Sequence, residues 1–361
     1  MPTTVTKEPT RKDYGTDVDR LLTTPRLPRA AIPLLAGGSV AVGFVVRVLT
    51  HSGWALGIVT AWVVLLVATF ASSRIVEGSR KAKDRSATAL VVSAFVIALL
   101  PLGGLLWQVV SNGAPSLTGS FFQESMRNVV GQGGGIYHAI WGTLLVTGMA
   151  AVLSIPIGLL SAIYVVEYGG NVTARAITFL VDVMTGIPSI VAGLFAYALF
   201  VIFFGEGVRL GFGGAVALSV LMIPLVVRSS EEVLKLVPNE LREASYALGV
   251  PKWRTIMKVV IPTALAGIVT GVTIAIARII GETAPLLIIC GATDSTNFNL
   301  FNGRIMTLPV FIYGQYKNPG FPPQFSQDRA WGAALVLVII IMVLNLVARL
   351  ISHFFSPKTK A

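Results

Sequence analysis

Residues 242–268 read REASYALGVPKWRTIMKVVIPTALAGI. The stretch carries Glu, Arg and Lys among Ala, Gly and Pro, although the long stretches around it contain almost no charge. Pro238, just upstream, suits the first turn of a helix, and Gly249 suits the left-handed position that ends one. A second helix follows and is expected to end at Pro262. Because neither helix is long enough to cross a bilayer, the sequence predicts a polar helical hairpin at the cytoplasmic membrane surface within 229–263.

The composition of the whole chain indicates a membrane protein. Of its 361 residues, 54% are hydrophobic and 12% are charged, against about 25% charged in a typical soluble domain. Apolar runs of about 20 residues, long enough to span a bilayer, recur along the sequence. We therefore expect an all-α, polytopic membrane protein with about eight transmembrane helices. The expected spans are 30–49, 55–72, 88–110, 138–166, 187–204, 212–228, 264–289 and 331–352.

Five regions follow from this pattern. Residues 1–29 are polar and charged, which predicts a disordered cytoplasmic tail. Residues 30–72 form an accessory pair of spans, and 73–87 form a basic cytoplasmic loop. The working transmembrane domain is expected at 88–352, with the polar hairpin inside it, and 353–361 form a second cytoplasmic tail.

The distribution of basic residues predicts the orientation. With the N-terminus in the cytoplasm, the inner segments contain 19 Lys and Arg and the outer segments contain five. This asymmetry follows the positive-inside rule, so both termini are expected on the cytoplasmic side of the inner membrane. We therefore attribute the net charge of +11 to the basic segments on the cytoplasmic side of the membrane. We expect membrane lipid, and no nucleic acid, among the partners.

Several kinds of site are excluded. Cys290 is the only cysteine, so no disulfide framework and no thiolate metal site is expected. The three histidines lie far apart and outside any metal-ligand motif. No GxxxxGK[ST] occurs, and no Gly is followed by Lys. The sequence therefore predicts no metal, no cofactor and no site of its own for nucleotide hydrolysis. It also offers no plausible catalytic nucleophile, which argues against a membrane enzyme.

The hairpin carries a recognisable motif. Glu243, Ala244 and Ser245 are followed by Gly249 four positions later, and Pro262 ends an aliphatic run. This pattern resembles the EAA loop of ABC importer permeases, with a mild departure at Ser245, where the family has alanine. The resemblance implies a loop that inserts into a cytoplasmic ATPase subunit and transmits its closing motion. Physical reasoning alone leaves open a hairpin that rests on lipid headgroups.

Two charges lie inside the seventh span. Arg278 is about 21 Å along it from Ala264, at about 1.5 Å per residue, and Glu282 is expected one turn later on the same face. Because a charge facing lipid costs about 2.5–3.5 kcal/mol, the two either form an internal ion pair or line a substrate path. Such an arginine offers planar donors to an oxyanion. Arg228 lies at the cytoplasmic end of span six, and Asp182 is expected in solvent at headgroup level.

A second resemblance concerns these charges. ARIIGETAPLL (277–287) and IPLVVRSSEEVLKLVP (223–238) are similar to the PstA-type membrane subunits of the phosphate-specific ABC importer. The similarity covers roughly 138–351 and implies a six-helix type I importer core. The pair at 30–72 departs from that core, and the only roles we expect for it are packing against a partner or contact with lipid.

By this resemblance, Arg228, Arg278 and Glu282 occupy positions of charged residues implicated in phosphate translocation. The implied partners are a paralogous permease forming a heterodimer, an ATPase homodimer, a phosphate-binding protein and phosphate. The alternative is a gradient-driven secondary anion transporter, with Glu282 as its proton carrier. That reading leaves the hairpin without a role.

Overall fold

The computed structural model describes residues 27–28, 30–51 and 53–355, and every regular element within them is helical. The expected all-α class is therefore confirmed for these residues. The predicted tails at 1–29 and 353–361 lie largely outside them. The chain forms two compact units, Met1–Leu105 and Leu106–Ala361.

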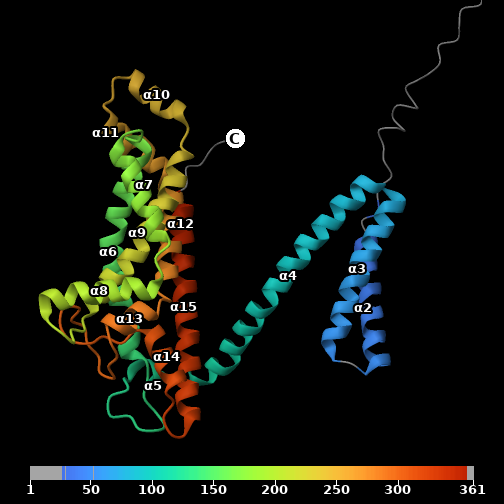
Figure 1. Ribbon diagram of the computed structural model, residues 1–361, viewed down its shortest axis with the longest axis horizontal. Helices are drawn as coiled ribbons and strands as arrows, with labels where there is room; N and C mark the ends of the chain where they lie inside the picture. The colour runs from blue at the N-terminus through green and yellow to red at the C-terminus, as the bar shows by residue number, and fades with distance from the viewer. Residues whose placement is uncertain (1–26, 29, 52, 356–361) are drawn as a thin grey trace, which may run out of the picture. The chain divides into compact units, whose positions relative to one another are not determined.

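The N-terminal unit begins with an antiparallel helical hairpin. Its helices are α2 (Ala31–Thr50) and α3 (Trp54–Val76), which lie side by side (Figure 1). Helix α4 (Ser79–Gly113) starts directly after the end of α3 and diverges from the pair; its last turns, from Leu106, belong to the C-terminal unit. All three are rich in apolar residues and long enough to cross a membrane.

One carboxylate joins the three helices of this unit. Glu77 accepts hydrogen bonds from the backbone N–H of Leu27 at 2.8 Å, from the Ser73 hydroxyl at 2.9 Å and from the Arg85 guanidinium at 2.8 Å. Its side chain is only 1% exposed. The chain before α2, the end of α3 and the start of α4 therefore meet at this residue.

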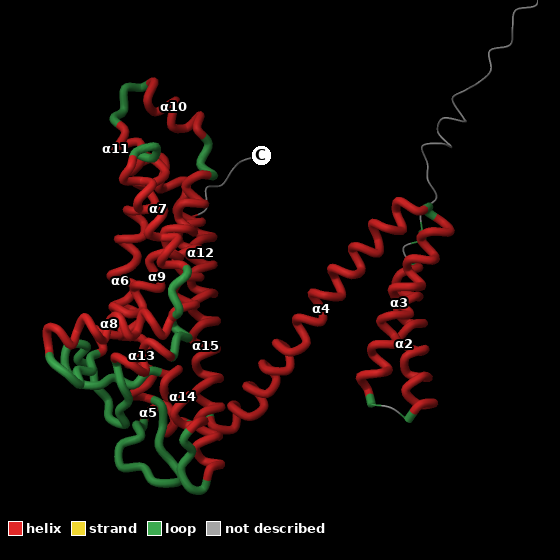
Figure 2. The backbone as a smooth tube through the Cα atoms, in the orientation of Figure 1, coloured by secondary structure: helices red, strands yellow, loops and turns green. Residues whose placement is uncertain are grey.

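The C-terminal unit is a bundle of helices (Figure 2). Its elements are η1 (Ala114–Ser116), α5 (Gly119–Gln123), α6 (Tyr137–Glu167), α7 (Val172–Thr185), α8 (Ser189–Phe204), α9 (Gly211–Lys235), α10 (Asn239–Ala247), α11 (Lys252–Thr255), η2 (Ile256–Val260), α12 (Ile261–Ile279), α13 (Ala284–Ile289), α14 (Leu308–Lys317) and α15 (Pro323–Phe355).

Helix α9 forms the centre of the bundle, in contact with α6, α7, α8, α12 and α13. Leu218, Met222 and Val226 are fully buried on it. They recur every four residues and so form one continuous stripe. The stripe packs into the main apolar core of the unit. Side chains on its C-terminal half are therefore held by neighbours on several sides.

The expected number of spans agrees with the structure. Seven described helices are long and apolar enough to cross a membrane, and the pair α7 and α8, bent by 108°, brings the number to eight if it is counted as one span. The bend lies at Gly186–Pro188, where Pro188 has no N–H for a continuing helix. The expected span at 187–204 is thus one arm of a bent pair.

Several expected spans have different limits in the structure: α4 begins at Ser79 instead of 88, α15 begins at Pro323 instead of 331, and two further differences concern the predicted hairpin and the charged residues. Helix α9 continues past residue 228 to Lys235, so the first part of the predicted hairpin is the end of a long helix. The span predicted at 264–289 is broken, because α12 ends at Ile279 and α13 begins at Ala284. Pro285 explains the break, since a proline there removes a helical hydrogen bond and clashes with the carbonyl four residues earlier.

Candidate functional site

The hairpin turns at a glycine, as predicted. Gly249 has φ of +75°, and its N–H donates to the Tyr246 carbonyl at 2.9 Å. The N–H of Val250 donates to the Ser245 carbonyl at 3.2 Å. These two bonds form a Schellman motif, which requires the left-handed residue that glycine supplies without strain. Helix α10 therefore ends at a defined point and the chain reverses into α11.

A buried hydroxyl pair closes the hairpin. The Oγ of Ser245 and the Oγ1 of Thr255 lie 2.8 Å apart, and both residues are buried. Ser245 is buried, whereas Leu241, Ala244 and Leu248 of the same short segment are exposed. Its small polar side chain holds α10 against α11, and the larger neighbours stay outside.

The hairpin is fixed to α6 by an ion pair. Arg242 donates from Nε and Nη2 to the Glu167 carboxylate at 3.0 and 2.9 Å. Lys252 donates to the Glu167 carbonyl and lies over the Tyr168 ring, 4.6 Å from its centroid. Both helices of the hairpin therefore contact the same end of α6.

The second arm of the hairpin runs directly into the membrane. Pro262 was expected to end it, but Pro262 lies in the first turn of α12. Residues Ile256–Val260 form a π-helical turn in which the Ile261 N–H donates to the Ile256 carbonyl. This wider turn accommodates the proline ring without breaking the helix. Movement of α11 is thereby linked to α12 along one helical path.

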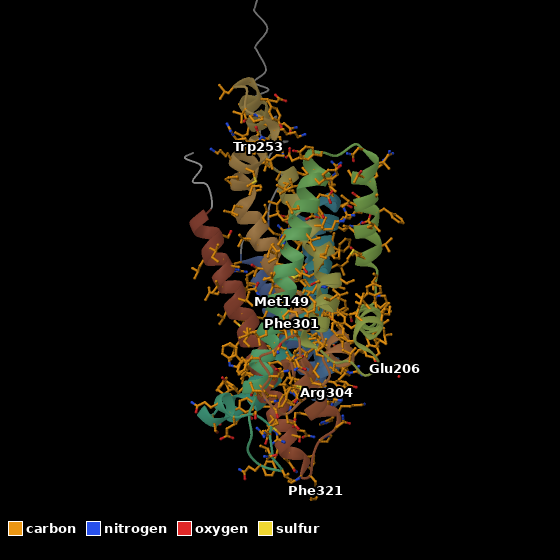
Figure 3. The ribbon with its side chains drawn as sticks, turned by 90° about the vertical axis from the view of Figure 1, so that its left-hand side faces the viewer. Met149, Glu206, Trp253, Phe301, Arg304 and Phe321 are labelled. Atoms are coloured by element: carbon orange, nitrogen blue, oxygen red, sulfur yellow. The ribbon has the colours of Figure 1, made fainter. Side chains whose placement is uncertain are left out.

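The hairpin also exposes apolar side chains. We call its exposed residues Leu241, Glu243, Ala244, Leu248 and Trp253 the coupling surface. Leu248 is 83% exposed and Trp253 is 59% exposed. Figure 3 shows Trp253 at one end of the C-terminal unit and Phe321 at the opposite end. Exposed apolar residues rimmed by charge are typical of a protein-binding surface.

A second site lies at the bend between α7 and α8. A cavity of about 240 Å³ is lined by four residues of this bend, by three residues of α9 and by Arg278 and Glu282. Helix α13 holds the wall in place through a close contact with α8. A Cβ built on Gly193 would lie 2.5 Å from the Pro285 Cα, so only glycine fits there. We call this cavity the charged pocket.

Arg278 and Glu282 share the charged pocket but are not on one helix face. Arg278 is the penultimate residue of α12, and Glu282 lies in the linker to α13, where its N–H donates to the Ile279 carbonyl at 3.1 Å. Of the ion pairs in the described residues, none involves either side chain. The internal ion pair considered from the sequence is therefore absent from this conformation, and the exposed Arg278 is turned to the pocket.

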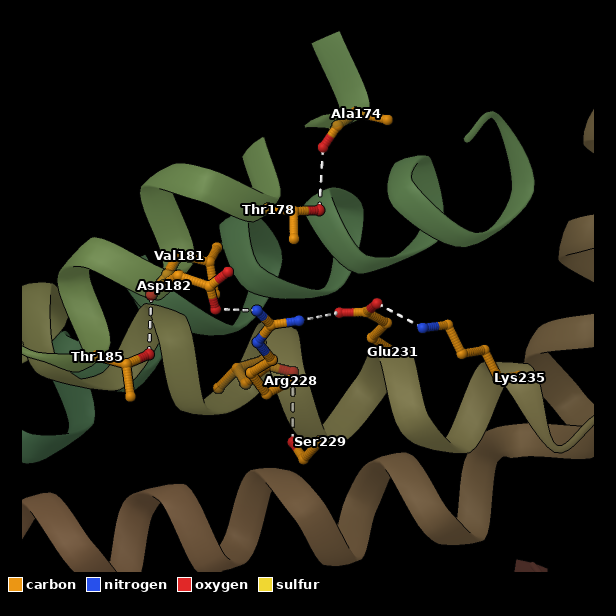
Figure 4. A network of polar contacts seen from close by, with 10 residues as sticks. Ala174, Thr178, Val181, Asp182, Thr185, Arg228, Ser229, Glu231 and Lys235 are labelled. Atoms are coloured by element: carbon orange, nitrogen blue, oxygen red, sulfur yellow. Dashed lines mark hydrogen bonds and ion pairs between the residues drawn. The ribbon is translucent and has the colours of Figure 1, made fainter. Parts of the chain in front are cut away.

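Arg228 does not line the charged pocket. It lies three residues beyond Leu225, which does, or about 4.5 Å along α9. Figure 4 shows its guanidinium between two carboxylates. Nη2 donates to Asp182 of α7, and Nη1 donates to Glu231 at 3.0 Å. Lys235 donates to the other Glu231 oxygen at 2.7 Å.

This network corrects the expectation for Asp182. Its side chain is 58% exposed, but it is paired with Arg228 instead of standing free in solvent. The pair connects α7 to α9 beside the bend. Asp182 and Glu167 were both missed as site residues. The available signal was that each is a single carboxylate within or directly after a long apolar stretch.

The two sites together describe a transport subunit. The charged pocket provides guanidinium donors and a carboxylate in a gap between helices, which suits a polar anion. The coupling surface lies at the end of the unit where α6 and α9 end and α12 begins, and it is connected to α6 and α12. A partner that moves the hairpin therefore moves helices of the bundle.

Comparisons with known proteins agree with this class. The family model described as binding-protein-dependent transport system inner membrane component matches residues 154–361. Phosphate transport system permease protein PstA 1 of Mycobacterium tuberculosis is 47% identical over 278 residues, covering 75% of this chain and 88% of that protein. PstA of Pasteurella multocida is 38% identical over 284 residues, covering 78% and 97%.

A solved structure supports the fold. A chain of a bacterial alginate ABC transporter, in complex with a periplasmic protein bound to an alginate pentasaccharide, superposes with a TM-score of 0.55 at 13% identity. The match covers 75% of this chain and 94% of that one. The fold and sites thus define a multi-pass membrane permease of the ABC importer class. The chain belongs to the family of binding-protein-dependent transport system inner membrane components, and within it to the PstA phosphate transport system permeases.

Proposed function

We propose that this chain is a membrane-spanning permease subunit of an ATP-driven importer of inorganic phosphate. The 47% identity to a phosphate transport system permease over 75% of the chain carries the choice of substrate. The charged pocket supports it, because a guanidinium group binds phosphate oxygens through two parallel hydrogen bonds.

The proposed path of phosphate passes the charged pocket. Arg278 binds the phosphate anion, and Glu282 limits the time for which it stays bound. The Glu282 carboxylate repels the phosphate dianion, but it can accept a hydrogen bond from a protonated phosphate oxygen. Arg228 receives the anion on the cytoplasmic side, in competition with Asp182 and Glu231. The 37% exposure of the Arg228 side chain leaves room for this exchange.

Energy enters through the hairpin. In this proposal a separate ATPase subunit binds the coupling surface around Glu243 and Ala244, and its closing moves the hairpin as one body. Ser245 keeps the two arms together, and Gly249 sets their angle. The helical path through Pro262 then carries the motion into α12, whose last turn contains Arg278.

The proposed assembly contains a paralogous permease as heterodimer partner, an ATPase homodimer and a phosphate-binding protein outside. ATP hydrolysis belongs to the ATPase subunits. The positive-inside rule supports cytoplasmic N- and C-termini, which places the hairpin inside and the loops around Phe321 outside.

Uptake of labelled phosphate into vesicles tests the proposal. The chain is purified from mild detergent with its bound partners and reconstituted with the binding protein outside and ATP inside. ATP-dependent uptake that stops in the Arg278→Gln variant is the expected result. Uptake by the chain alone, driven by an ion gradient without ATP, would instead support a secondary transporter. Recovery of the chain without any ATPase subunit would also contradict the proposal.

A further inference from the structure

The N-terminal unit contains a cavity of its own. It measures about 310 Å³ and lies between the hairpin α2–α3 and the first turns of α4. Its walls are mainly apolar, with Leu35 from α2, Leu66 from α3 and Val92 from α4 among them. A dry apolar cavity of about 150 Å³ already binds a molecule of benzene. The cavity therefore has room for a segment of hydrocarbon chain.

The hydroxyl groups in its walls do not call for a polar ligand. Thr69 donates to the Leu65 carbonyl at 2.7 Å, and Ser93 donates to the Ala89 carbonyl at 2.6 Å. The hydroxyls of Ser72 and Thr88 also donate to carbonyls of their own helices. With these hydrogens used inside the helices, the cavity presents a hydrocarbon surface.

The rim of the cavity is basic. Arg85 forms part of the lining, and its side chain is 31% exposed beside its single ion pair with Glu77. Lys81 lies one turn before Arg85 on the same face of α4 and is half-buried. Residues 73–85 contain five Lys and Arg against two acidic residues. Basic clusters between membrane helices at a membrane surface are typical sites for anionic lipid headgroups.

We propose that this cavity binds one acyl chain of an anionic phospholipid, with the lipid phosphate held by Arg85 and Lys81. The bilayer supplies this ligand directly, because Val63 of α3 and Val91 of α4 are exposed on helices of membrane-spanning length. The N-terminal tail is a poorer occupant. Residues 1–26 are rich in charge and contain only one pair of adjacent large aliphatic residues, Leu21 and Leu22. The site is independent of the proposed transport path.

Native mass spectrometry of the purified full chain tests this site. Phosphatidylglycerol and phosphatidylcholine with identical acyl chains are titrated separately, and we expect phosphatidylglycerol to bind about tenfold more tightly because of the basic rim. The variant Lys81→Gln should lose most of this preference while phosphatidylcholine binding stays unchanged. Equal binding of both lipids to the wild-type chain would overturn the proposal.

A pocket-filling variant and its control locate the acyl chain. Ala89 lines the cavity, so Ala89→Trp should lower phosphatidylglycerol binding about tenfold. Val91→Trp adds the same side chain two residues away on the exposed face of α4 and should leave binding unchanged. Equal binding by the two variants would contradict the assignment of the cavity.

A measurement on the wild-type chain tests the site even if the variants do not fold correctly. A phosphatidylglycerol with a photoreactive acyl chain should label peptides that contain residues 65–72 and 88–93 above all others. Even labelling over all the lipid-facing helices, or labelling confined to residues 1–26, would reject the site.

Discussion

Arg242 on the hairpin and Glu167 at the end of α6 form an ion pair of 2.9 Å, although 75 positions separate them in the sequence. Their side chains are only 12% and 5% exposed. Arg242 also donates to the carbonyls of Val237 at 2.6 Å and Leu234 at 3.1 Å. One guanidinium thus joins the end of α9, the hairpin and α6, so these three elements move together.

Replacing Glu167 should loosen this joint. Glu167→Gln leaves the guanidinium nearly buried without its counter-charge, and removing one partner of a buried pair typically costs about 3–5 kcal/mol. We expect lower thermal stability of the purified complex and faster proteolysis of residues 236–255. ATP hydrolysis should continue while phosphate uptake falls.

The pair itself is measured by a double-mutant cycle. Arg242→Gln combined with Glu167→Gln should cost less than the sum of the two single changes, because no unpaired charge remains. Additive effects would show that the two side chains do not interact in the working protein.

Gly249 provides a sharper test of the hairpin angle. A Cβ at this position meets nothing within 4 Å, so the effect of a substitution comes only from φ of +75°. A left-handed backbone costs an ordinary L-residue about 1–2 kcal/mol. Gly249→Val should therefore uncouple ATP hydrolysis from phosphate uptake, as measured in the same vesicles.

The matched control at this position is Gly249→Asn, because asparagine adopts the left-handed conformation more readily. It should retain most of the coupled uptake. If valine and asparagine behave alike, the backbone conformation of this turn is not what links the two activities.

Local chemistry made part of this structure predictable. The left-handed turn at Gly249 follows from a glycine between two short helical patterns, and the membrane spans follow from the lengths of apolar runs. The break before α13 was also present in the sequence, as Pro285, but the apolar composition around it favoured one long span. For that reason Glu282 was placed on the same helix face as Arg278.

Pairings across the bundle were not predictable in the same way. Asp182 meets Arg228 only because α7 packs beside α9, and one sequence does not say which helices are neighbours. The same holds for Glu167 and Arg242. The sequence did show that these charges lie in or beside apolar stretches. Because burying an unpaired charge there is costly, each charge was expected to need a partner or a ligand.

The charged pocket predicts a difference between arginine and lysine. Arg278→Lys keeps the positive charge but loses the planar fork that binds two oxygens of one phosphate. A lost charge-assisted hydrogen bond is worth about 1.5–3 kcal/mol, so the apparent KM for phosphate uptake should rise about tenfold or more. Arg349→Lys, on the exposed face of α15, is the control and should leave KM unchanged. Equal KM values for both variants would show that Arg278 does not contact phosphate during transport.

Glu77 gives the N-terminal unit a predictable response to acid. The Leu27 N–H, the Ser73 hydroxyl and Arg85 lower the pKa of this carboxyl below its ordinary value of 4.5. Because its pKa is lowered in the folded state, its stabilising effect is complete above pH 4.5 and is lost as the pH falls through the lowered value. Hydrogen exchange of the Leu27 amide, corrected for the intrinsic rate, should therefore accelerate on acidification. In Glu77→Ala, which has no acceptor at this position, the amide should exchange fast at every pH, and a wild-type protection factor that does not change with pH would contradict this role of the carboxylate.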